Sequence, residues 1–400
     1  MDIIIVAHFC GGLKKDENSR FTYIARELAK TDDVELITSD FIHTEKRTRS
    51  NRQFDFPFKV TVLPEPPYPR NVCLERFASH WALGKNVARY LAERKVPDVI
   101  YCAVPSLDIA AAAARYARKH NVRFIVDIQD LWPEAFKMVF NVPVLSDLIF
   151  APMEQMANGI YGQADAIVAV SKTYSDRGLA VNKKCTKAST VFLGTDISVF
   201  DENVRTGRKA VTREDKPLLA YCGTLGSSYD LICVFDALKI LRDRGETAPQ
   251  FIVMGSGPRR EEFEQYAKKL DLDVVFTGSL PYPDMCATLC QCDITVNPIT
   301  RGAAGSIINK HADYAACGLP VLNTQECQEY RDLVDEYQMG LNCTNSDAVD
   351  LAEKMRVLLA DPDLCHRMGE NSRRCAMERF DRRQSYREIF ACILSGKENT

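Results

Sequence analysis

The sequence predicts an α/β protein of two doubly wound domains of similar size, each built on a parallel sheet with helices on both faces. Three observations support this fold class. Short apolar runs such as residues 3–7 and 251–254 alternate with longer stretches of helical periodicity. The polar stretch 205–216 interrupts the alternation, which then begins again. The chain of 400 residues has 46% hydrophobic and 26% charged residues, which is ordinary for a water-soluble chain of roughly two to three domains.

The first half alternates strands and helices from its first residues. A β-branched strand over 3–7 leads into a Gly11-Gly12 loop and then into a helix over 18–30 that carries Arg20. Strands that alternate with helices form parallel sheets covered on both faces. Further strands are predicted at 34–38, 59–63, 98–102, 124–127 and 166–170, and further helices at 72–94 and 107–120.

In the second half, two predicted strands end in glycine loops. The strand 218–222 precedes Gly223-Thr-Leu-Gly226, and the strand 251–254 precedes Gly255-Ser-Gly257. Ligands of open parallel sheets bind beyond the carboxyl ends of the strands, so we expect a nucleotide there, in the cleft between the domains. The predicted boundaries are 1–203 for the first domain, 204–216 for a linker, 217–377 for the second domain and 378–400 for a C-terminal segment that packs back on the first domain.

Residues 305–321 have the pattern of a loop, a short helix and a buried strand. The helix should begin near Asn309 and end at Ala316 or Cys317, before Gly318 and Pro320. Its free N–H groups and Lys310 in its first turn favour a diphosphate. Asp313, three residues after Lys310, lies on the same face of the helix and could bind the hydroxyls of a ribose. The alternative is an ordinary helix with a solvated lysine and aspartate.

Composition narrows the choice of partners and of compartment. The formal net charge of -3 gives no general reason to expect nucleic acid. We interpret the basic run 46–52 as a solvated loop, with attraction to an anionic membrane surface as the alternative. The fifteen cysteines lie mostly in apolar segments and are expected to be reduced core residues, and Cys286, Cys290 and Cys292 lack the partners of a zinc site. A strand at the very start and no spanning apolar run indicate a cytoplasmic protein.

Five motifs of the second half carry a family resemblance, at residues 220–226, 253–258, 274–278, 292–298 and 309–321. In order and spacing they resemble the retaining glycosyltransferases of family 4. That family has the GT-B architecture, two facing Rossmann-like domains with an interdomain cleft, and uses nucleotide-sugar donors. Segments 18–29, 164–171 and 193–200 of the first half are also similar to the family. Residues 126–134, Val-Asp-Ile-Gln-Asp-Leu-Trp-Pro-Glu, resemble the branch that makes bacterial surface polysaccharides.

The resemblance implies functional residues in both domains. Asp130 stands where many relatives have a histidine that faces the transferred sugar, so it is a candidate catalytic residue, with capping of the next turn as the alternative. Lys310 is the second candidate catalytic residue, at the leaving diphosphate. Gly11, Gly12 and Arg20 are assigned to the acceptor or phosphate side. The donor nucleotide is assigned to Gly223, Thr224, Gly226, Gly255, Gly257, Leu280, Ser306, Ile307, Ile308, Asn309, Lys310 and Asp313.

The chain also departs from the family pattern. Gly305 replaces the first of two glutamates that the family often carries, and the usual arginine and lysine are absent from residues 223–229. Lys310 must then supply most of the cationic charge, with help from Arg20 or Arg301. No metal or cofactor is expected, because Asp271-Leu-Asp273 lies in the linker before a strand rather than in a site. A dehydrogenase is disfavoured, since Gly255-Ser-Gly257 lacks a third glycine at the dinucleotide-binding spacing.

The resulting hypothesis is a metal-independent, retaining glycosyltransferase of the hexosyltransferase type. It would move a sugar from a nucleotide-sugar, in the first place a UDP-sugar, to a saccharide or polyprenyl-linked acceptor at the inner face of the membrane. A non-catalytic GT-B partner protein that binds nucleotide-sugar is the alternative, and an epimerase would need more acid and base groups. His311 either lines the phosphate site or packs internally, and Trp132 either forms an acceptor wall or packs in the core.

Overall fold

The computed structural model describes residues 1–11, 13, 19–50, 53–71, 73–139, 142, 145–213, 215–303 and 306–395, with only the backbone of residues 138 and 139. The chain divides into two compact units. Unit 1 comprises Met1–Val191 together with the C-terminal segment from Tyr386, and unit 2 comprises Phe192–Ser385. The predicted Gly12 and Gly305 lie outside the described residues.

The division between the units differs from the predicted boundaries at both points where the chain passes from one unit to the other. It lies at Val191 rather than at residue 203, because helix α7 (Ile197–Thr206) packs on α10 (Tyr282–Leu289) and contributes Phe200 to the core of unit 2. The stretch 204–216 therefore belongs to unit 2. The return to unit 1 starts at Tyr386 rather than at residue 378, since Phe380 still packs in the core of unit 2.

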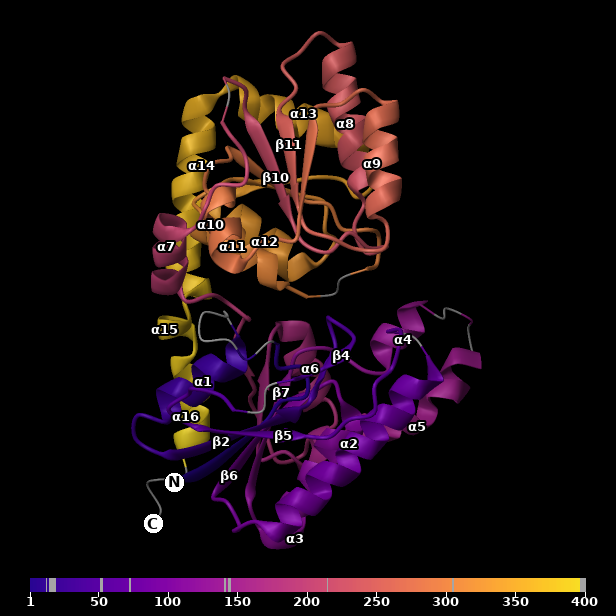
Figure 1. The fold of residues 1–400 in the computed structure, drawn as a ribbon, viewed down its shortest axis with the longest axis vertical. Helices are drawn as coiled ribbons and strands as arrows, with labels where there is room; N and C mark the ends of the chain where they lie inside the picture. The colour runs from indigo at the N-terminus through magenta and orange to yellow at the C-terminus, as the bar shows by residue number, and fades with distance from the viewer. Residues whose placement is uncertain are drawn as a thin grey trace. The chain divides into compact units, whose positions relative to one another are not determined.

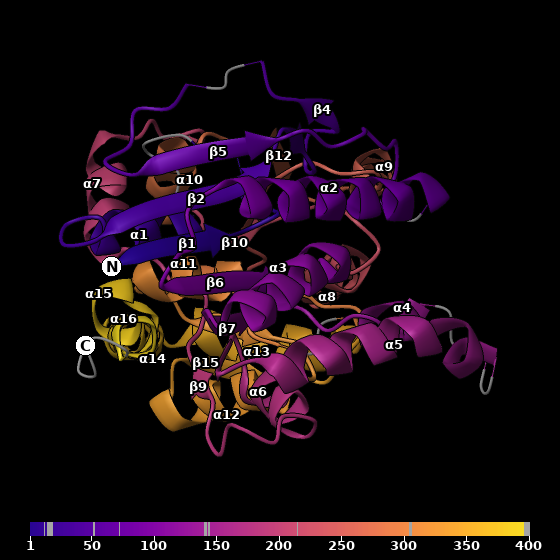
Figure 2. The same cartoon turned by 90° about the horizontal axis from the view of Figure 1, so that it is seen from below.

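Unit 1 contains a seven-stranded parallel sheet in the order β5-β2-β1-β6-β7-β8-β9. Figure 2 shows β5, β2, β1, β6 and β7 following one another in this order. The strands are rich in buried β-branched residues, as a sheet covered on both faces requires. Their bounds are β1 Asp2–Val6, β2 Asp33–Ser39, β5 Lys59–Leu63, β6 Val99–Val104, β7 Arg123–Ile128, β8 Ala166–Ala169 and β9 Ser189–Thr190.

The helices of unit 1 cover both faces of this sheet. On one face α1 packs with the C-terminal helix α16, whose Ile389 and Ile393 join the same core as Ile24. Helices α2 and α3, and α3 and α5, lie side by side (Figures 1 and 2). Their bounds are α1 Arg20–Leu28, α2 Leu74–Glu93, α3 Leu107–His120, α4 Glu134–Val139, α5 Leu145–Gln163, α6 Lys172–Leu179 and α16 Arg387–Leu394, and a short antiparallel pair joins β3 (Phe41–Ile42) to β4 (Arg47–Thr48).

Unit 2 contains a six-stranded parallel sheet in the order β12-β11-β10-β13-β14-β15. Figure 1 shows two of its strands, β10 and β11, side by side. Alternate residues of β10 face opposite sides: Leu218 and Ala220 pack with α10, α11 and α12, whereas Leu219 and Tyr221 pack with α8, α9 and α13. The bounds are β10 Leu218–Cys222, β11 Gln250–Met254, β12 Val274–Gly278, β13 Ile294–Asn297, β14 Val321–Asn323, β15 Gly340–Asn342, α8 Leu231–Asp243, α9 Arg260–Lys269, α11 Asn309–Ala316, α12 Gln328–Tyr337, α13 Ala348–Ala360 and α14 Pro362–Cys375; a π-helical turn, η1 Ala376–Phe380, and the short helix α15 Arg382–Ser385 follow.

The predicted elements are present, and the differences have local causes. After Asp347 the chain forms two helices, α13 and α14, rather than one, because Pro362 starts α14 and the carboxylate of Asp361 accepts a hydrogen bond from the backbone N–H of Leu364 at 2.8 Å. Helices were expected between the strands at 124–127 and 166–170, but the bounds of α4 and α5 were not predicted. Pro152 and two glycines inside α5 weaken its helical signal.

Two further predictions are wrong. Cys290 and Cys317, which follow α10 and α11, form a disulfide, whereas the sequence analysis expected all cysteines to be reduced. The basic run 46–52 is not simply a solvated loop, because Arg49 is buried and donates from Nη2 to the carbonyl of Cys10 at 2.6 Å. Within the described part of the chain, no helix is long and apolar enough to cross a bilayer.

Candidate functional site

Two glycine loops meet at the carboxyl ends of β10 and β11 in unit 2. Gly223 and Gly255 have φ angles of 150° and 156°, which side-chain-bearing residues rarely adopt. A Cβ atom on Gly255 would lie 1.8 Å from the carbonyl oxygen of Gly223, and one on Gly257 would lie 2.3 Å from that of Leu225. The loops therefore pack backbone against backbone, and glycine is required at these positions.

The ammonium group of Lys310 lies beside these loops. A Cβ atom on Gly223 would be only 2.9 Å from Nζ of Lys310. The Nζ atom stands 4.1 Å from the ring centre of Tyr221 and 4.0 Å from that of Tyr229. Among the described residues it has no hydrogen-bond partner, although the side chain is buried. Burial lowers the pKa of Lys310 to about 7.

This lysine lies in the first turn of α11, at the helix end where backbone N–H groups are free to bind an anion. Ile308 is the residue before the helix, and its N–H donates to Nδ1 of His311 at 3.2 Å. The His311 ring is fully buried and stacks on Tyr330 at 3.6 Å between ring centres. His311 therefore packs internally and braces the helix start, which is the second of its two predicted roles.

Asp313 lies one turn further along the same helix. Its carboxylate accepts a hydrogen bond from the hydroxyl of Tyr282 at 2.8 Å, and this hydroxyl also contacts Thr195 Oγ1 at 3.2 Å. Burial raises the pKa of Asp313 to about 6, against the opposing effect of the Tyr282 hydrogen bond. The side chain is held in place by its neighbours, as a residue that binds a ribose hydroxyl needs to be.

The remaining predicted donor residues lie around this lysine and its helix, or along the loops. Thr224 is exposed and its carbonyl accepts from the Tyr221 hydroxyl at 2.8 Å; the carbonyl of Gly226 accepts from the N–H of Tyr229 at 3.2 Å. Leu280, which follows β12, packs on the core of unit 2. Ser306 and Ile307 are buried just before Ile308 and Asn309. Arg301, by contrast, is exposed and pairs with Glu326 at 3.4 Å.

Asp130 lies in unit 1, after the end of β7. One carboxylate oxygen accepts from the backbone N–H of Leu131 at 2.9 Å, and the hydroxyl of Tyr174 contacts it at 3.4 Å. Burial raises the pKa of Asp130, although hydrogen bonds from Leu131, Trp132 and Tyr174 oppose the shift. The Leu131 contact joins neighbouring residues in the turn after β7, and both predicted roles of Asp130, catalysis and capping of that turn, stay predictions.

Arg20 has a structural environment rather than that of a phosphate ligand. Its guanidinium is buried and forms two hydrogen bonds with Asp127, from Nε at 2.8 Å and from Nη2 at 3.1 Å. A third bond of 3.1 Å reaches the hydroxyl of Tyr386 in the C-terminal segment. We therefore assign Arg20 to the attachment of α1 and the C-terminal segment, and not to the charge at the diphosphate.

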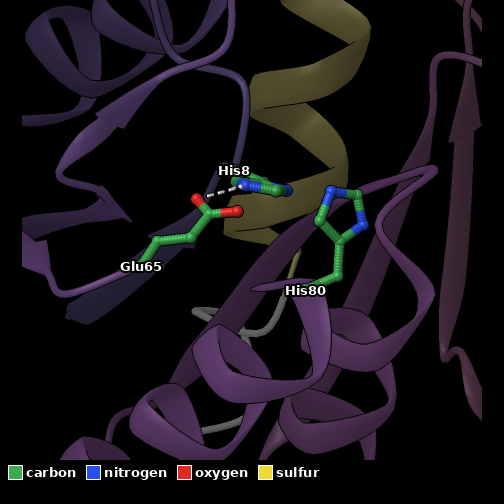
Figure 3. Close-up of side chains that lie close together, drawn as sticks. All are labelled: His8, Glu65 and His80. Carbon is green, nitrogen blue, oxygen red and sulfur yellow. Dashed lines mark hydrogen bonds and ion pairs between the residues drawn. The ribbon is translucent and has the colours of Figure 1, made fainter. Parts of the chain in front are cut away.

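The structure also brings together a buried cluster in unit 1 that the sequence analysis missed: His8, Glu65 and His80 (Figure 3). His8 follows β1, Glu65 follows β5, and His80 lies on α2. The Nε2 atom of His8 lies 2.8 Å from Glu65 Oε2, and the rings of His8 and His80 meet edge to face at 4.7 Å. The ligand atoms of the three side chains lie within 4.8 Å of one another, close enough to hold a metal ion.

Serine hydroxyl groups surround this cluster. Ser106 Oγ lies 2.6 Å from Nδ1 of His8, Ser79 Oγ donates to Oε1 of Glu65 at 2.7 Å, and Ser39 Oγ donates to Oε2. Burial opposes ionisation of Glu65, but its hydrogen bonds with His8 and the two serines keep its pKa below the ordinary value. The His8–Glu65 pair is thus fully hydrogen-bonded, whereas Nε2 of His80 has no partner among the described residues.

Two family descriptions match the chain. Residues 18–181 match "Glycosyl transferase 4-like domain", and residues 205–375 match "Glycosyl transferases group 1". The first region lies in unit 1 and the second in unit 2, so each matched region corresponds to one parallel-sheet unit.

Individual relatives are distant but extend over most of the chain. The EpsD protein of Bacillus subtilis (strain 168) is 20% identical over 344 residues, which is 84% of each chain. The solved structure of HepE from Anabaena, in complex with UDP, has a TM-score of 0.72 at 16% identity and covers 99% of this chain and 100% of its own. WaaG, a glycosyltransferase involved in lipopolysaccharide biosynthesis, has a TM-score of 0.67 at 17% identity and covers 98% and 99%. The fold is therefore GT-B, and with the two family matches it supports a GT-B glycosyltransferase.

Proposed function

We propose that this protein transfers a sugar from a UDP-sugar, with the donor diphosphate bound by unit 2. The observation that carries the proposal is the buried ammonium group of Lys310, which has no hydrogen-bond partner among the described residues and lies at a helix N-terminus beside two glycine loops. HepE, which has the same fold, was solved with UDP and with UDP-glucose. A nucleoside diphosphate would supply the anion that Lys310 lacks.

The proposed chemistry follows from this arrangement. Breaking the bond between sugar and diphosphate develops negative charge on the leaving phosphate. Fixed N–H donors of α11 and the Lys310 ammonium would stabilise that charge more in the transition state than in the ground state. These groups can perform the role that a divalent cation has in other transferases, so we propose a metal-independent reaction. Retention of the anomeric configuration is proposed from the family resemblance.

Unit 1 is the proposed acceptor side. The acceptor we propose is a saccharide or a polyprenyl-linked saccharide of surface-polysaccharide synthesis, used at the inner face of the membrane. The resemblance of residues 126–134 to that branch, together with WaaG as a structural neighbour, supports this choice. The second candidate function is a non-catalytic partner that binds nucleotide-sugar, which the replacement of the usual glutamate by Gly305 favours.

Calorimetric titration with UDP, together with UDP release from a panel of UDP-sugars, tests the proposal. Wild type should bind UDP, and Lys310→Ala should weaken binding by roughly 1–3 kcal/mol, the range for a charge-assisted hydrogen bond. Lys269→Ala, at the far end of α9, is the matched control and should bind as wild type does. An unchanged dissociation constant for Lys310→Ala would remove this lysine from the donor site.

A further inference from the structure

We propose that unit 1 holds a phosphate-binding site for the acceptor, formed by Arg76 and Lys46 above the His8–Glu65–His80 cluster. The inference rests on the proposed function, since it names the chemical class of the acceptor that unit 1 would bind. The inference goes beyond the proposed function because it assigns residues that no motif or family resemblance identified.

The cluster lies at the edge of the unit 1 sheet where ligands of open parallel sheets usually bind. Five neighbouring strands end here: Ser39 is the last residue of β2, and β1, β5, β6 and β7 are followed by His8, Glu65, Ser106 and Asp130. Figure 3 shows His8, Glu65 and His80 converging on one point from three separate segments.

Two cations stand together at this place without an acidic partner of their own. Arg76 is buried and Lys46 is half-buried, and neither forms an ion pair with any described residue. Lys46 Nζ donates to Asn71 Oδ1 at 2.6 Å, and Arg76 Nη1 donates to the Asn71 carbonyl at 2.6 Å. Burial and the charge of Arg76 lower the pKa of Lys46, against the opposing charge of Glu65, and an anion bound beside both cations would stabilise their charged forms.

The two cations are held on aromatic rings rather than on carboxylates. Arg76 lies 4.7 Å from the centre of the Trp132 ring, and Lys46 lies 4.8 Å from that of Tyr68. Trp132 also stacks on His80, with the two rings nearly parallel at 5.7 Å. Aromatic contacts position the charges without neutralising them, so an anionic ligand would meet them preorganised.

Helix α2 presents two unsatisfied nitrogen atoms on one face. Nε of Arg76 and Nε2 of His80 are buried and have no hydrogen-bond partner within the described residues. Arg76 and His80 are four positions apart, so both side chains lie on the same side of the helix. A guanidinium and an imidazole can both donate to phosphate oxygens, and a bound phosphate would satisfy both atoms.

A divalent metal ion fits the same cluster less well. His8 and Glu65 already satisfy each other at 2.8 Å and are fixed by serine hydroxyls. Arg76 and Lys46 beside them would repel a dication. The carboxylates of Glu65 and Asp130 also act on Arg76, so the preference for an anion rests on the unsatisfied nitrogen atoms of Arg76 and His80.

The outer surface of the same helix suggests where the rest of an acceptor lies. Leu74 and Trp81 on α2 are 84% and 55% exposed, and Leu148 and Ile149 on α5 are 74% and 60% exposed. A phosphate can belong to a lipid-linked acceptor, whose chain such apolar side chains would contact, or to a soluble sugar phosphate. Both kinds of acceptor carry a phosphate, and only the lipid-linked acceptor has a hydrocarbon chain.

The test is a calorimetric titration with inorganic pyrophosphate and with farnesyl diphosphate, on protein whose donor site is saturated with UDP. Both anions should bind. Arg76→Gln should weaken binding at least tenfold and Lys46→Gln about fivefold, whereas Arg70→Gln, an exposed cation on the approach to α2, should change it less than twofold. Tighter binding of farnesyl diphosphate than of pyrophosphate would assign the phosphate to a lipid-linked acceptor, and equal binding would assign it to a soluble one; both support the site.

Several results would overturn the inference. One is equal affinity of wild type, Arg76→Gln and Lys46→Gln for both anions. Another is stoichiometric binding of Zn²⁺ that His80→Ala abolishes, with anion affinity independent of Arg76. If Arg76→Gln does not fold by circular dichroism, Lys46→Gln carries the test, because Lys46 is only half-buried. If UDP itself does not bind, the proposed function fails separately, and the anion titration is repeated without UDP on Lys310→Ala.

Discussion

The titration of Lys310 predicts a specific pH dependence of UDP binding. In the empty site the pKa of Lys310 is about 7, because the ammonium group is buried between Tyr221 and Tyr229 with no anion beside it. A bound diphosphate would raise this pKa again, since an opposite charge stabilises the ammonium form. Above pH 7 the free protein must therefore take up a proton in order to bind UDP.

The size of the pH effect on UDP binding follows from the lowered pKa of Lys310. At pH 8 only about one tenth of the free lysine is protonated, so about 0.9 proton should be taken up for each UDP bound. Because half of the free lysine is protonated at pH 7, UDP affinity should fall about 50-fold between pH 7 and pH 9, equivalent to about 2.3 kcal/mol, and the decline approaches tenfold per pH unit above pH 8. The terminal phosphate of UDP loses its last proton near pH 6 and does not interfere in this range.

Calorimetry in buffers of different ionisation enthalpy measures both the affinity and the proton uptake. Lys310→Met, which keeps the length of the side chain and removes its charge, is the control and should bind weakly with no pH dependence above 7. An affinity of the wild type that stays constant from pH 7 to pH 9 would refute the reasoning. So would equal proton uptake by wild type and Lys310→Met.

Three further predictions concern the catalytic role of Asp130, the need for a metal ion and the packing of the glycine loops. Asp130→Asn can still accept the hydrogen bond from the Leu131 N–H but loses the charge. If Asp130 contacts the transferred sugar, turnover should fall about 100-fold, equivalent to about 2.7 kcal/mol, with UDP affinity unchanged; a mutant as fast as wild type would make Asp130 a structural residue. Exhaustive EDTA treatment should leave turnover intact, and loss of activity that magnesium or manganese restores would show the donor-site assignment to be wrong. Gly255→Ala should lower the melting temperature and the UDP affinity, because the new Cβ atom would lie 1.8 Å from the carbonyl oxygen of Gly223. Gly245→Ala is the control: Gly245 also has a positive φ angle, but its new Cβ atom would meet no atom within 4 Å, so UDP affinity should stay at the wild-type value. Equal UDP affinities of the two variants would exclude the close packing of the loops.

Helix α11 could be predicted because its signals are local. Gly318 and Pro320 mark its end, and the spacing of Lys310 and Asp313 places both on one side. The aromatic surroundings of Lys310 could not be predicted in the same way, since Tyr221 and Tyr229 come from β10 and the loop that follows it, far back in the chain.

The cluster in unit 1 was missed for the same physical reason. His8, Glu65 and His80 are isolated residues in the sequence, and only the order of the parallel strands brings their segments to one edge. Arg20 illustrates the same dependence on tertiary structure: the family resemblance assigned it to the acceptor or phosphate side, but Asp127, distant in sequence, accepts two hydrogen bonds from its guanidinium. Pairings between distant side chains depend on tertiary structure, which periodicity and spacing do not encode.

The most direct test of the central claim is UDP release from UDP-sugars by wild type and Lys310→Met, with saccharide and polyprenyl-linked acceptors present. The account predicts that wild type releases UDP from at least one donor and that Lys310→Met releases it at least tenfold more slowly. If the wild type binds UDP but releases no UDP from any UDP-sugar with any acceptor, the claim is contradicted. That result is expected of a non-catalytic partner protein.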